Sequence, residues 1–572
     1  MTQPAARTAL EFLCTALCAS AFAGYSPVSL CPDWVRLEDR HGTNALVRQG
    51  GDWILNDVRV TFSRVSPDEV RVSVASPSRP LELVRIGWRI ETSDPVRMFS
   101  EPWGPDLGWN PLDRERTSGW FFLLNENGRT HGWGVKTQPN AIAFWRVASD
   151  RITLALDLSA AGDGVRLGGR TLEAVTLVSR EGGAAESPYQ SARAFCRLMC
   201  PHPRLPREPV FGYNDWYCAY GANTATNFLA DAAFVVSLAK GLPSRPFVVM
   251  DDGWQENSPP VLKVKTGEFQ SGWGPWDRAG THFGMEMEEF AGRIAALGAK
   301  PGLWYRPLHT WSGVPERLKL KGAKGHPTVP GTPGFFDPTL PEVKAMIAAD
   351  IGRFRRWGFR LVKCDYISYD VFGKYFFRGE ADERLFTDSR EWSDRSRTTA
   401  EVMLDLYRTI RAAAGDDMVV IGCNAFNHLV PGLFEIQRTG HDTSGWKWEK
   451  TAKFGPEALG TRAIFNGVFY AADPDCIGLA EAGAIPWEKN RQWLDAVARS
   501  HQALFISWRR QLSTAETGAA FRRAFATAAA GGANGEPLDW MDRTHCRRWR
   551  FADGEAEYDW FSGFPIQEHA KE

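Results

Sequence analysis

The sequence predicts an α/β protein built around a (β/α)8 TIM barrel, with an N-terminal antiparallel β-sandwich and a short C-terminal β region. Apolar and polar residues alternate at every second position through about the first third of the chain. From Val210 onward, short apolar strands alternate with helices, and eight such units match the usual size of a barrel. At 572 residues the chain is also too long for a single hydrophobic core.

Residues 1–186 are predicted to form the sandwich domain. The segments 70–74 (VRVSV) and 152–158 (ITLALDL) have the period-two pattern of half-buried strands, and Asp163-Gly164 marks a turn between strands. Regularly spaced turns between short alternating strands are typical of a β-sandwich. We therefore expect a single antiparallel domain here.

The N-terminal residues resemble a signal peptide only in part. Leu13 to Ala23 is apolar, and its last three residues resemble a signal-peptidase site, but Glu11 interrupts the stretch and Arg7 is the only cation before it. The ten cysteines do not have the spacing of a dense disulfide framework, so reduced thiols are the simpler interpretation. A cytoplasmic location is therefore expected, with export as the alternative.

Residues 187–209 are predicted to be a linker helix, because 187–200 has helical spacing behind a Ser cap and the Pro-rich 202–209 ends it. The barrel is predicted over 210–530. Its strand candidates are 210–217, 246–251, 300–307, 359–366, 418–425, 434–442, 468–475 and 503–508. Its clearest helices are 225–240, 285–297, 341–357, 399–414, 488–501 and 519–530. Residues 531–572 are too few for an independent sandwich and are expected to pair a few strands against the barrel.

Charge and motifs exclude several classes of partner. Lys plus Arg (67) and Asp plus Glu (68) nearly cancel, so nucleic acid is not an expected partner. Beyond the N-terminus, no segment approaches the roughly 20 apolar residues that span a bilayer, so no membrane partner is expected. Cys14 and Cys18, like Cys196 and Cys200, have no matching second pair for a zinc site. There is also no P-loop or dinucleotide fingerprint, so neither a metal nor a cofactor is expected.

Two aspartates end predicted barrel strands, where barrel enzymes place their reacting groups. Asp365 ends strand four with Lys363 two residues before it, and Asp442 ends strand six, aligned with Arg438. A glycosidase needs two carboxyl groups with different tasks, so we assign Asp365 as nucleophile and Asp442 as acid/base. Across a barrel their carboxyls would lie about 5–6 Å apart, near the retaining distance. The alternative is that each caps a turn or forms a structural ion pair.

Asp251 and Asp252 follow the second predicted strand. Where the pleat ends, both side chains can reach the rim, and carboxylates hold sugar hydroxyls through charge-assisted hydrogen bonds. The pair is predicted to recognise two hydroxyls of one sugar. The alternative is a solvated Asp-Asp-Gly turn.

Several sequence blocks between about residues 205 and 480 occur in a specific order. They are FGYNDWY (211–217), VVMDDGWQ (248–255), LVKCDY (361–366), RTGHD (438–442) and AADPDC (471–476). In this order and spacing the chain resembles the clan D retaining α-glycosidases, and most resembles the melibiase-like α-galactosidases of glycoside hydrolase families 36 and 27. The succession of sandwich, linker helix and barrel resembles family 36 in particular.

The resemblance implies roles for individual residues. It implies that Asp365 is the nucleophile and Asp442 the acid/base, and that Asp251 and Asp252 bind the 4- and 6-hydroxyls of the sugar. The further sugar contacts that it implies are Lys363, Arg438, an aromatic wall at Trp216, and Tyr305 and Arg306 at the mouth.

Two positions depart from the family pattern. Cys423-Asn424-Ala425 stands where family 36 has a Cys-Ser-Gly-Gly segment and family 27 a Cys-Glu-Trp segment, and this position faces the 2-substituent in those families. Asn424 is therefore a predicted substrate contact, and the sugar's identity at carbon 2 stays open. His441 replaces a small or acidic residue before the acid/base, where it would shift the pH optimum or simply pack as a neutral ring.

The leading hypothesis is a retaining, exo-acting, α-galactosidase-like glycoside hydrolase that acts on an oligosaccharide or glycoside, as a monomer or a homo-oligomer. One alternative keeps the mechanism but changes the substrate to an α-N-acetylgalactosaminide or another α-glycoside, or changes the reaction to transglycosylation. A second alternative, from another class, is a catalytically silent carbohydrate-binding protein.

Overall fold

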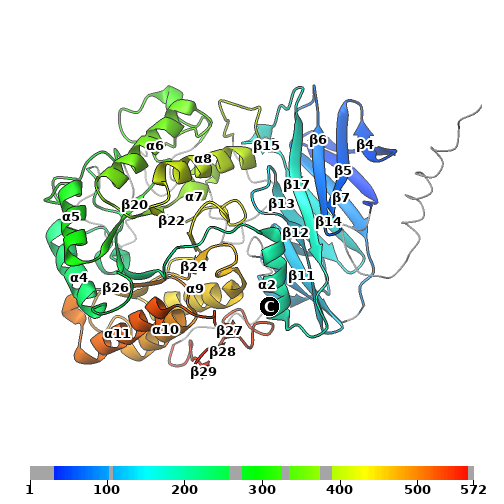
Figure 1. Ribbon diagram of the computed structural model, residues 1–572. Coiled ribbons are helices and arrows are strands. Elements are labelled where there is room, and N and C mark those ends of the chain that lie inside the picture. Colours follow the sequence, from blue (N-terminus) through cyan, green and yellow to red (C-terminus); the bar gives the residue numbers. More distant parts are fainter. Residues whose placement is uncertain are drawn as a thin grey trace, which may run out of the picture. The chain divides into compact units, whose positions relative to one another are not determined.

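The computed structural model describes residues 31–93, 95–101, 107–256, 274–323, 334–373 and 389–564. These residues form two compact units, coloured from blue to cyan for the first and mainly from green to red for the second in Figure 1. The first unit contains the residues up to Ser159, Asp163–Met199 and Ser396–Thr399; the second contains Ala160–Gly162, Cys200–Arg395 and the residues from Ala400 onward. The signal-like stretch at 13–23 lies outside the described residues.

Two antiparallel sheets form the first unit, as the period-two pattern predicted. One sheet has the strand order β10 (Arg116–Ser118), β13 (Ile142–Ala148), β14 (Arg151–Asp157), β7 (Leu83–Arg89), β1 (Trp34–Asp39) and β2 (Gly42–Ala45). The other has the order β3 (Val47–Gln49), β4 (Asp52–Leu55), β5 (Val58–Ser66), β6 (Glu69–Ala75), β17 (Thr171–Arg180), β12 (Arg129–Val135), β11 (Phe121–Glu126), β8 (Val96–Ser100) and β9 (Gly108–Pro111). The predicted turn at Asp163-Gly164 is strand β16 of a two-stranded ribbon with β15 (Ser159–Ala160).

Aromatic side chains fill the space between the two sheets. The Phe122 ring of β11 lies 5.3 Å from the Trp145 ring of β13, which belongs to the opposite sheet, and 5.4 Å from the Trp133 ring of β12. All three side chains are buried. Contacts of this kind, made by inward-facing residues of both sheets, define a β-sandwich core.

Helix α2 (Pro188–Met199) belongs to the first unit and packs on β12. Two glycines of β12 leave the room for this packing. A Cβ atom on Gly132 would lie 2.4 Å from the Phe195 ring, and one on Gly134 would lie 3.0 Å from the Met199 sulfur. The segment that the sequence predicts as a linker helix therefore lies on the sandwich.

Nine parallel strands form the barrel of the second unit, and eight of them lie in the eight predicted segments. Their order is β24 (Ala471–Asp473), β23 (Ile436–Arg438), β22 (Val419–Gly422), β21 (Leu361–Cys364), β20 (Lys300–Tyr305), β19 (Phe247–Met250), β18 (Phe211–Asn214), β26 (Leu504–Trp508) and β25 (Ile477–Leu479). Every pairing between neighbours in this order is parallel. This arrangement confirms the predicted barrel.

The seventh barrel strand is interrupted, and the interruption closes the barrel. Strand β24 pairs with β23, whereas β25, four residues further along, pairs with β26. Between them Asp475 has a φ of +85°, which regular strands do not allow. The amide of Ala503 also donates to the carbonyl of Ala472 at 2.8 Å, so both halves bond to the eighth strand segment. The sequence predicts one continuous strand here.

Helices surround the barrel strands in the second unit (Figure 1). The predicted ones occur as α4 (Ala225–Leu238), α5 (Met287–Leu297), α6 (Pro341–Arg356), α8 (Thr399–Ala414), α10 (Trp487–Arg499) and α11 (Ala515–Ala530). Shorter turns are α3 (Trp216–Ala219), α7 (Ile367–Phe372), η2 (Glu316–Leu318), η4 (Ala463–Phe465) and η5 (Arg510–Leu512).

Helix α9 (Trp448–Thr461) is absent from the sequence prediction. It contains Gly455, Pro456 and Gly460, which are all poor helix formers. The two glycines are needed for packing, because a Cβ atom would lie 2.9 Å from the Trp493 ring at Gly455 and 2.8 Å from the Cys546 sulfur at Gly460. Tertiary contacts therefore outweigh the weak local propensity.

The C-terminal residues form a three-stranded antiparallel sheet, β27 (Glu536–Pro537), β28 (Arg548–Phe551) and β29 (Gly554–Glu557). Trp549 and Trp560 are fully buried, and the Trp448 indole of α9 donates to the Trp560 carbonyl at 2.8 Å. This sheet is the short β region that the sequence predicts, and it packs with the helix that follows the sixth barrel strand.

All eight cysteines in the described part of the chain are free thiols. Within the same residues, no helix combines the length and the apolar character that crossing a bilayer requires.

Candidate active site

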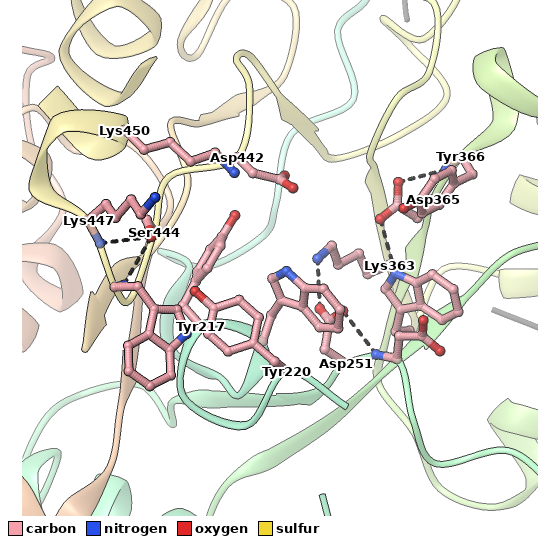
Figure 2. A pocket seen from close by; sticks show the side chains of 14 residues that line it. Tyr217, Tyr220, Asp251, Lys363, Asp365, Tyr366, Asp442, Ser444, Lys447 and Lys450 are labelled. Atoms are coloured by element: carbon pink, nitrogen blue, oxygen red, sulfur yellow. Dashed lines mark hydrogen bonds and ion pairs between the residues drawn. The ribbon is translucent and has the colours of Figure 1, made fainter. Parts of the chain in front are cut away.

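A cavity of about 570 Å³ lies at the carboxyl ends of the barrel strands. Its lining residues lie near the carboxyl ends of β18, β19, β20 and β21, in the loop after β23 and in the first turn of α9. The lining residues are Trp216, Tyr217, Tyr220, Asp251, Asp252, Trp304, Lys363, Asp365, Tyr366, Asp442, Ser444, Trp446, Lys447 and Lys450. Figure 2 places Asp365 and Asp442 on opposite sides of this space, with the Asp442 carboxylate directed toward the Asp365 side.

Asp365 is nearly buried, and three N–H groups bind its carboxylate. The Asn424 amide and the backbone N–H of Tyr366 each donate to Oδ1 at 2.6 Å, and the Trp304 indole donates to Oδ2 at 3.0 Å. Only 7% of the residue is exposed. Donors of this kind stabilise an ionised carboxylate and fix its orientation. The arrangement leaves Oδ2, with a single donor, as the oxygen that is freer to react.

Two residues that hold Asp365 have unusual backbone conformations. Tyr366 has a φ of +61° and Asn424 a φ of +56°, in the left-handed region that residues other than glycine rarely adopt. The amide of Ser368 donates to the carbonyl of Asn424 at 2.8 Å, which joins the turn after β21 to the loop after β22. Backbone strain of this kind is concentrated at functional sites, where the surrounding structure maintains it.

Asp442 has a very different environment, because 55% of its side chain is exposed. Its hydrogen-bond donor is the Arg438 guanidinium, at a long 3.3 Å. The loss of water contacts raises the pKa of Asp442, but the positive charges of Arg438, Lys450 and Lys363 outweigh this effect and lower the pKa below its ordinary value. Asp442 is therefore an open, readily ionised carboxyl.

Arg438 is held behind the pocket by a second carboxylate, that of Asp475. The guanidinium donates to Asp475 at 2.8 Å, and only 4% of the Arg438 side chain is exposed. The same Asp475 oxygen accepts hydrogen bonds from the Tyr217 hydroxyl and from the amide of Thr443 at 2.8 Å. The break in the seventh strand thus places the Asp475 carboxylate against Arg438, which in turn contacts Asp442. Arg438, a predicted substrate contact, is not among the lining residues.

Lys363 pairs with Asp251, whereas the sequence analysis placed it beside Asp365. Its ammonium lies 2.7 Å from Asp251 Oδ2, which also accepts from the Asn214 amide at 2.7 Å. The reason is that both side chains belong to inward-facing positions of the barrel, so Lys363 reaches across β20 to the end of β19. Asp252 also lines the pocket, and its Oδ1 accepts from the Gln255 amide at 2.7 Å.

The structure places two other predicted residues away from the pocket. The Tyr305 hydroxyl donates to Asp350 of α6 at 3.1 Å, and the Tyr305 side chain is fully buried. Arg306 binds Asp370 at 2.6 Å and lies over the Tyr366 ring at 4.1 Å. Because neighbouring strand residues face opposite sides, Trp304 points into the pocket and Tyr305 into the helix layer.

Aromatic side chains form one wall of the pocket. Trp216, predicted for this role, lies 5.6 Å from the Tyr220 ring, and Tyr220 stacks on Trp446 at 6.3 Å with 24° between the ring planes. The Tyr220 hydroxyl accepts the amide of Gly445 at 3.0 Å, which fixes the loop that carries Trp446. The sequence analysis did not identify Trp304, Tyr220 or Trp446. Trp304 could have been found from the sequence, because side chains alternate along its strand and its position faces inward. Tyr220 and Trp446 could not, because only the folded loops bring them together.

One buried acid next to the pocket was also missed. Asp215 accepts the amide of Asp251 at 2.7 Å and the Asn223 side chain at 3.2 Å, and it is 2% exposed. Burial, together with the negative charge of Asp251, raises the pKa of Asp215 to about 8. Asp215 is therefore neutral below that pH and does not add a charge beside Asp251.

This shift predicts a pH-dependent stability. From its ordinary pKa of 3.8 up to about 8, folded Asp215 keeps a proton that the unfolded chain has lost, so the folded state loses stability as the pH rises through this window. In Asp215→Asn the group is neutral at every pH. The free energy of unfolding of the variant relative to the wild type should rise with pH by at most about 1.4 kcal/mol per unit, and level off above about pH 8. Urea unfolding of both proteins between pH 5 and 9 measures this, and a constant difference would contradict the assignment.

Within the described ranges, no group of three or more His, Cys, Asp or Glu side chains is arranged to hold a metal ion.

No protein-family model matches the sequence. Several solved structures share its fold. An α-galactosidase from Thermus thermophilus, in complex with p-nitrophenyl α-D-galactopyranoside, has a TM-score of 0.56 and 16% identity, covering 92% of this chain and 99% of that one. The GH36 α-galactosidase AgaA from Geobacillus stearothermophilus has a TM-score of 0.52 and 13% identity, covering 87% and 75%. An α-galactosidase from Lactobacillus brevis has a TM-score of 0.52 and 12% identity, covering 88% and 73%. At these identities the likeness establishes the fold.

Proposed function

We propose that the chain is a glycoside hydrolase of the α-galactosidase type, which removes a terminal α-linked galactosyl unit with retention of configuration. The observation that carries the proposal is the pair formed by Asp365 and Asp442, which face one cavity from opposite sides in contrasting environments (Figure 2). A retaining glycosidase needs one fixed, ionised carboxylate and one carboxyl that exchanges protons. The shared fold with proteins described as α-galactosidases supports the same class.

The first step of the proposed reaction uses both groups at once. Asp365 attacks the anomeric carbon and forms a covalent ester while the glycosidic C–O bond breaks. Asp442 gives its proton to the departing oxygen, so the aglycone leaves as a neutral alcohol. The hydrogen bonds from Trp304, Tyr366 and Asn424 hold the attacking carboxylate in place.

The second step reverses these roles. Asp442, now ionised, removes a proton from a water molecule, and the water oxygen attacks the anomeric carbon. The ester bond to Asp365 breaks, so the carboxylate is regenerated and the sugar leaves with its original anomeric configuration. The exposed side of Asp442 gives water access to this position.

Asp442 must be protonated for the first step, although its pKa lies below its ordinary value. A bound glycoside would cover the exposed half of the side chain, and the loss of water raises the pKa of a carboxyl group. Binding of substrate therefore favours the protonated form at the moment when it is needed. In the enzyme–substrate complex, the alkaline limb of kcat reports the loss of this proton.

The position of the alkaline limb of the pH–rate profile should depend on Lys450. Lys450 is one of the cations that lower the pKa of Asp442, so Lys450→Met should raise that pKa and move the limb to higher pH, by up to about one unit. Lys447, on the same wall, is not among the main cations that lower the pKa of Asp442, and Lys447→Met should move the limb less. The measurement is kcat for an aryl α-galactoside from pH 4 to 9. A limb that stays fixed in Lys450→Met, or moves equally in both variants, would remove Asp442 from the role of acid.

The sugar would lie against Asp251, Asp252 and Lys363 at the floor of the pocket, with Trp216 and Trp304 beside it. The two carboxylates accept hydroxyl donors, and Lys363, already bound to Asp251, has further donors to offer. Asn424 binds Asp365, so its amide is a positioning group for the nucleophile.

A panel of chromogenic α-glycosides tests the proposal. We expect turnover of the α-galactoside, and proton NMR of the first-formed sugar should give the α-anomer before mutarotation. Turnover of the α-N-acetylgalactosaminide in place of the α-galactoside would keep the mechanism and change the sugar. First-formed β-anomer would contradict retention. Binding of galactose without any hydrolysis would show that the protein is a carbohydrate-binding protein and not a hydrolase.

A further inference from the structure

Two lysines line the pocket on the acid/base side. Lys447 and Lys450 are both exposed, and Figure 2 places them at the end of the pocket that carries Asp442, with Asp365 and Tyr366 at the other end. Across the described part of the chain, neither ammonium makes a hydrogen bond or an ion pair with another residue. The other cations at the site are engaged, Lys363 with Asp251 and Arg438 with Asp475.

The local fold brings these two lysines together. Lys447 is the N-cap residue of α9 and Lys450 lies in its first turn, and both side chains line the pocket. The Ser444 hydroxyl accepts the amides of Trp446 and Lys447 at 3.0 and 3.1 Å and so fixes the turn that precedes the helix. Cations at a helix N-terminus oppose the helix dipole, so this position is unfavourable for α9 itself. The two charges also repel each other unless an anion lies between them.

The position of the lysines relative to Asp442 identifies what they would contact. The acid/base lies beside the oxygen of the leaving group, and Lys450 is close enough to act electrostatically on Asp442. When Asp442 is protonated for the first step, its negative charge is gone, and both ammonium groups face the aglycone without a counter-charge. The stacked rings of Tyr220 and Trp446 lie on the same wall and offer an apolar surface to the rest of the aglycone.

We infer that the aglycone part of the pocket takes a leaving group that carries an oxyanion, a carboxylate or a sulfate or phosphate ester, held between Lys447 and Lys450. This inference rests on the proposed function and specifies its substrate class. The substrate would be an α-galactoside whose aglycone is acidic. Ammonium groups bind such oxyanions as point charges, with modest strength while they remain partly in water.

The experiment compares two aryl α-galactosides with leaving groups of similar reactivity, 3-carboxy-4-nitrophenyl and its neutral 3-carbamoyl analogue. For the wild type at low salt we expect kcat/KM to favour the carboxylate by about tenfold, mainly through KM, with the preference falling as salt is added. A third substrate with a sulfate ester at the same position separates a carboxylate site from one for larger oxyanions. The preference is a ratio within one protein, so changes in the pKa of Asp442 cancel.

Variants assign the preference to the lysines. Lys447→Met and Lys450→Met should each reduce the ratio, and the double variant should bring it close to one. Lys240→Met removes an exposed lysine outside the pocket lining and should keep the wild-type ratio, which controls for net charge. Circular dichroism checks the fold of each variant.

The outcomes are distinct. A wild-type ratio near one, with the neutral substrate still hydrolysed, overturns the inference and leaves the proposed function intact. A tenfold ratio that survives in the double variant also overturns the inference, because residues other than Lys447 and Lys450 would then bind the carboxylate of the aglycone. If no aryl α-galactoside is hydrolysed at all, both the function and the inference fall.

Discussion

Replacement of Asp365 by alanine is expected to lower kcat for 4-nitrophenyl α-galactoside on the order of 10⁴-fold or more, because the covalent step loses its nucleophile. The loss should appear in kcat more than in KM, since the proposed sugar contacts at Asp251, Asp252 and Lys363 remain in the pocket lining. The change removes a small side chain at the rim of a strand, and its three hydrogen-bond donors can turn to water in the pocket. Steady-state kinetics with a matched circular dichroism spectrum measures the effect.

Added azide gives this prediction a chemical signature. A small anion can occupy the space left by the carboxylate and attack the anomeric carbon from the same side. It should restore turnover and yield a β-galactosyl azide, opposite in configuration to the substrate. Asp416→Ala is a suitable control, because this carboxylate is 75% exposed and pairs with Arg204 away from the pocket. A folded Asp365→Ala protein with near wild-type turnover would exclude the residue as nucleophile.

Replacement of Asp442 by alanine should have an effect that depends on the leaving group. A substrate with a poor leaving group needs the proton in the first step, and general acid catalysis is worth about 10²–10⁴-fold. A 2,4-dinitrophenyl galactoside needs little protonation, so its first step should be nearly unchanged. Its turnover would then be limited by the second step, which has lost its base.

Azide should again report the role through the product. In Asp442→Ala it can attack the galactosyl ester of Asp365 without needing a base, and two successive inversions yield an α-galactosyl azide. The two variants should therefore give azides of opposite configuration. An equal loss for all leaving groups, or a β-azide from Asp442→Ala, would assign Asp442 a structural role.

The barrel strands were predictable because each combines an apolar run with a helix on either side. The interrupted seventh strand was not, because the break depends on the positive φ of Asp475, and on the hydrogen bonds from Tyr217, Arg438 and Thr443 that hold it. Those partners come from two other segments of the chain, the turn after β18 and the end of β23 with its following loop. Helix α9 was missed for a related reason, since Gly455 and Gly460 serve contacts with distant residues and only lower the local propensity.

Asp365 could be placed from its position directly after a strand, and Asp442 was placed in the right region although β23 ends four residues before it, but the partners of both could not be placed. Lys363 precedes Asp365 by two residues and therefore shares its face, yet the barrel curvature brings Asp251 within 2.7 Å of its ammonium. The donors that hold Asp365 come instead from β20 and from the loop after β22, through Trp304 and Asn424. Sequence spacing predicts which face a residue occupies; it does not predict which strand supplies the partner.

The assignment of Asp365 and Asp442 to one reaction is tested most directly by trapping the covalent intermediate. A fluorinated α-galactosyl fluoride forms the ester quickly and slows its hydrolysis, and peptide mass spectrometry then locates the sugar. The account predicts one galactosyl adduct on the peptide that contains Asp365, formed at the normal rate in the wild type and absent in Asp365→Ala. An adduct on a different carboxylate, or complete turnover of an α-galactoside to first-formed β-galactose without any adduct, would contradict it.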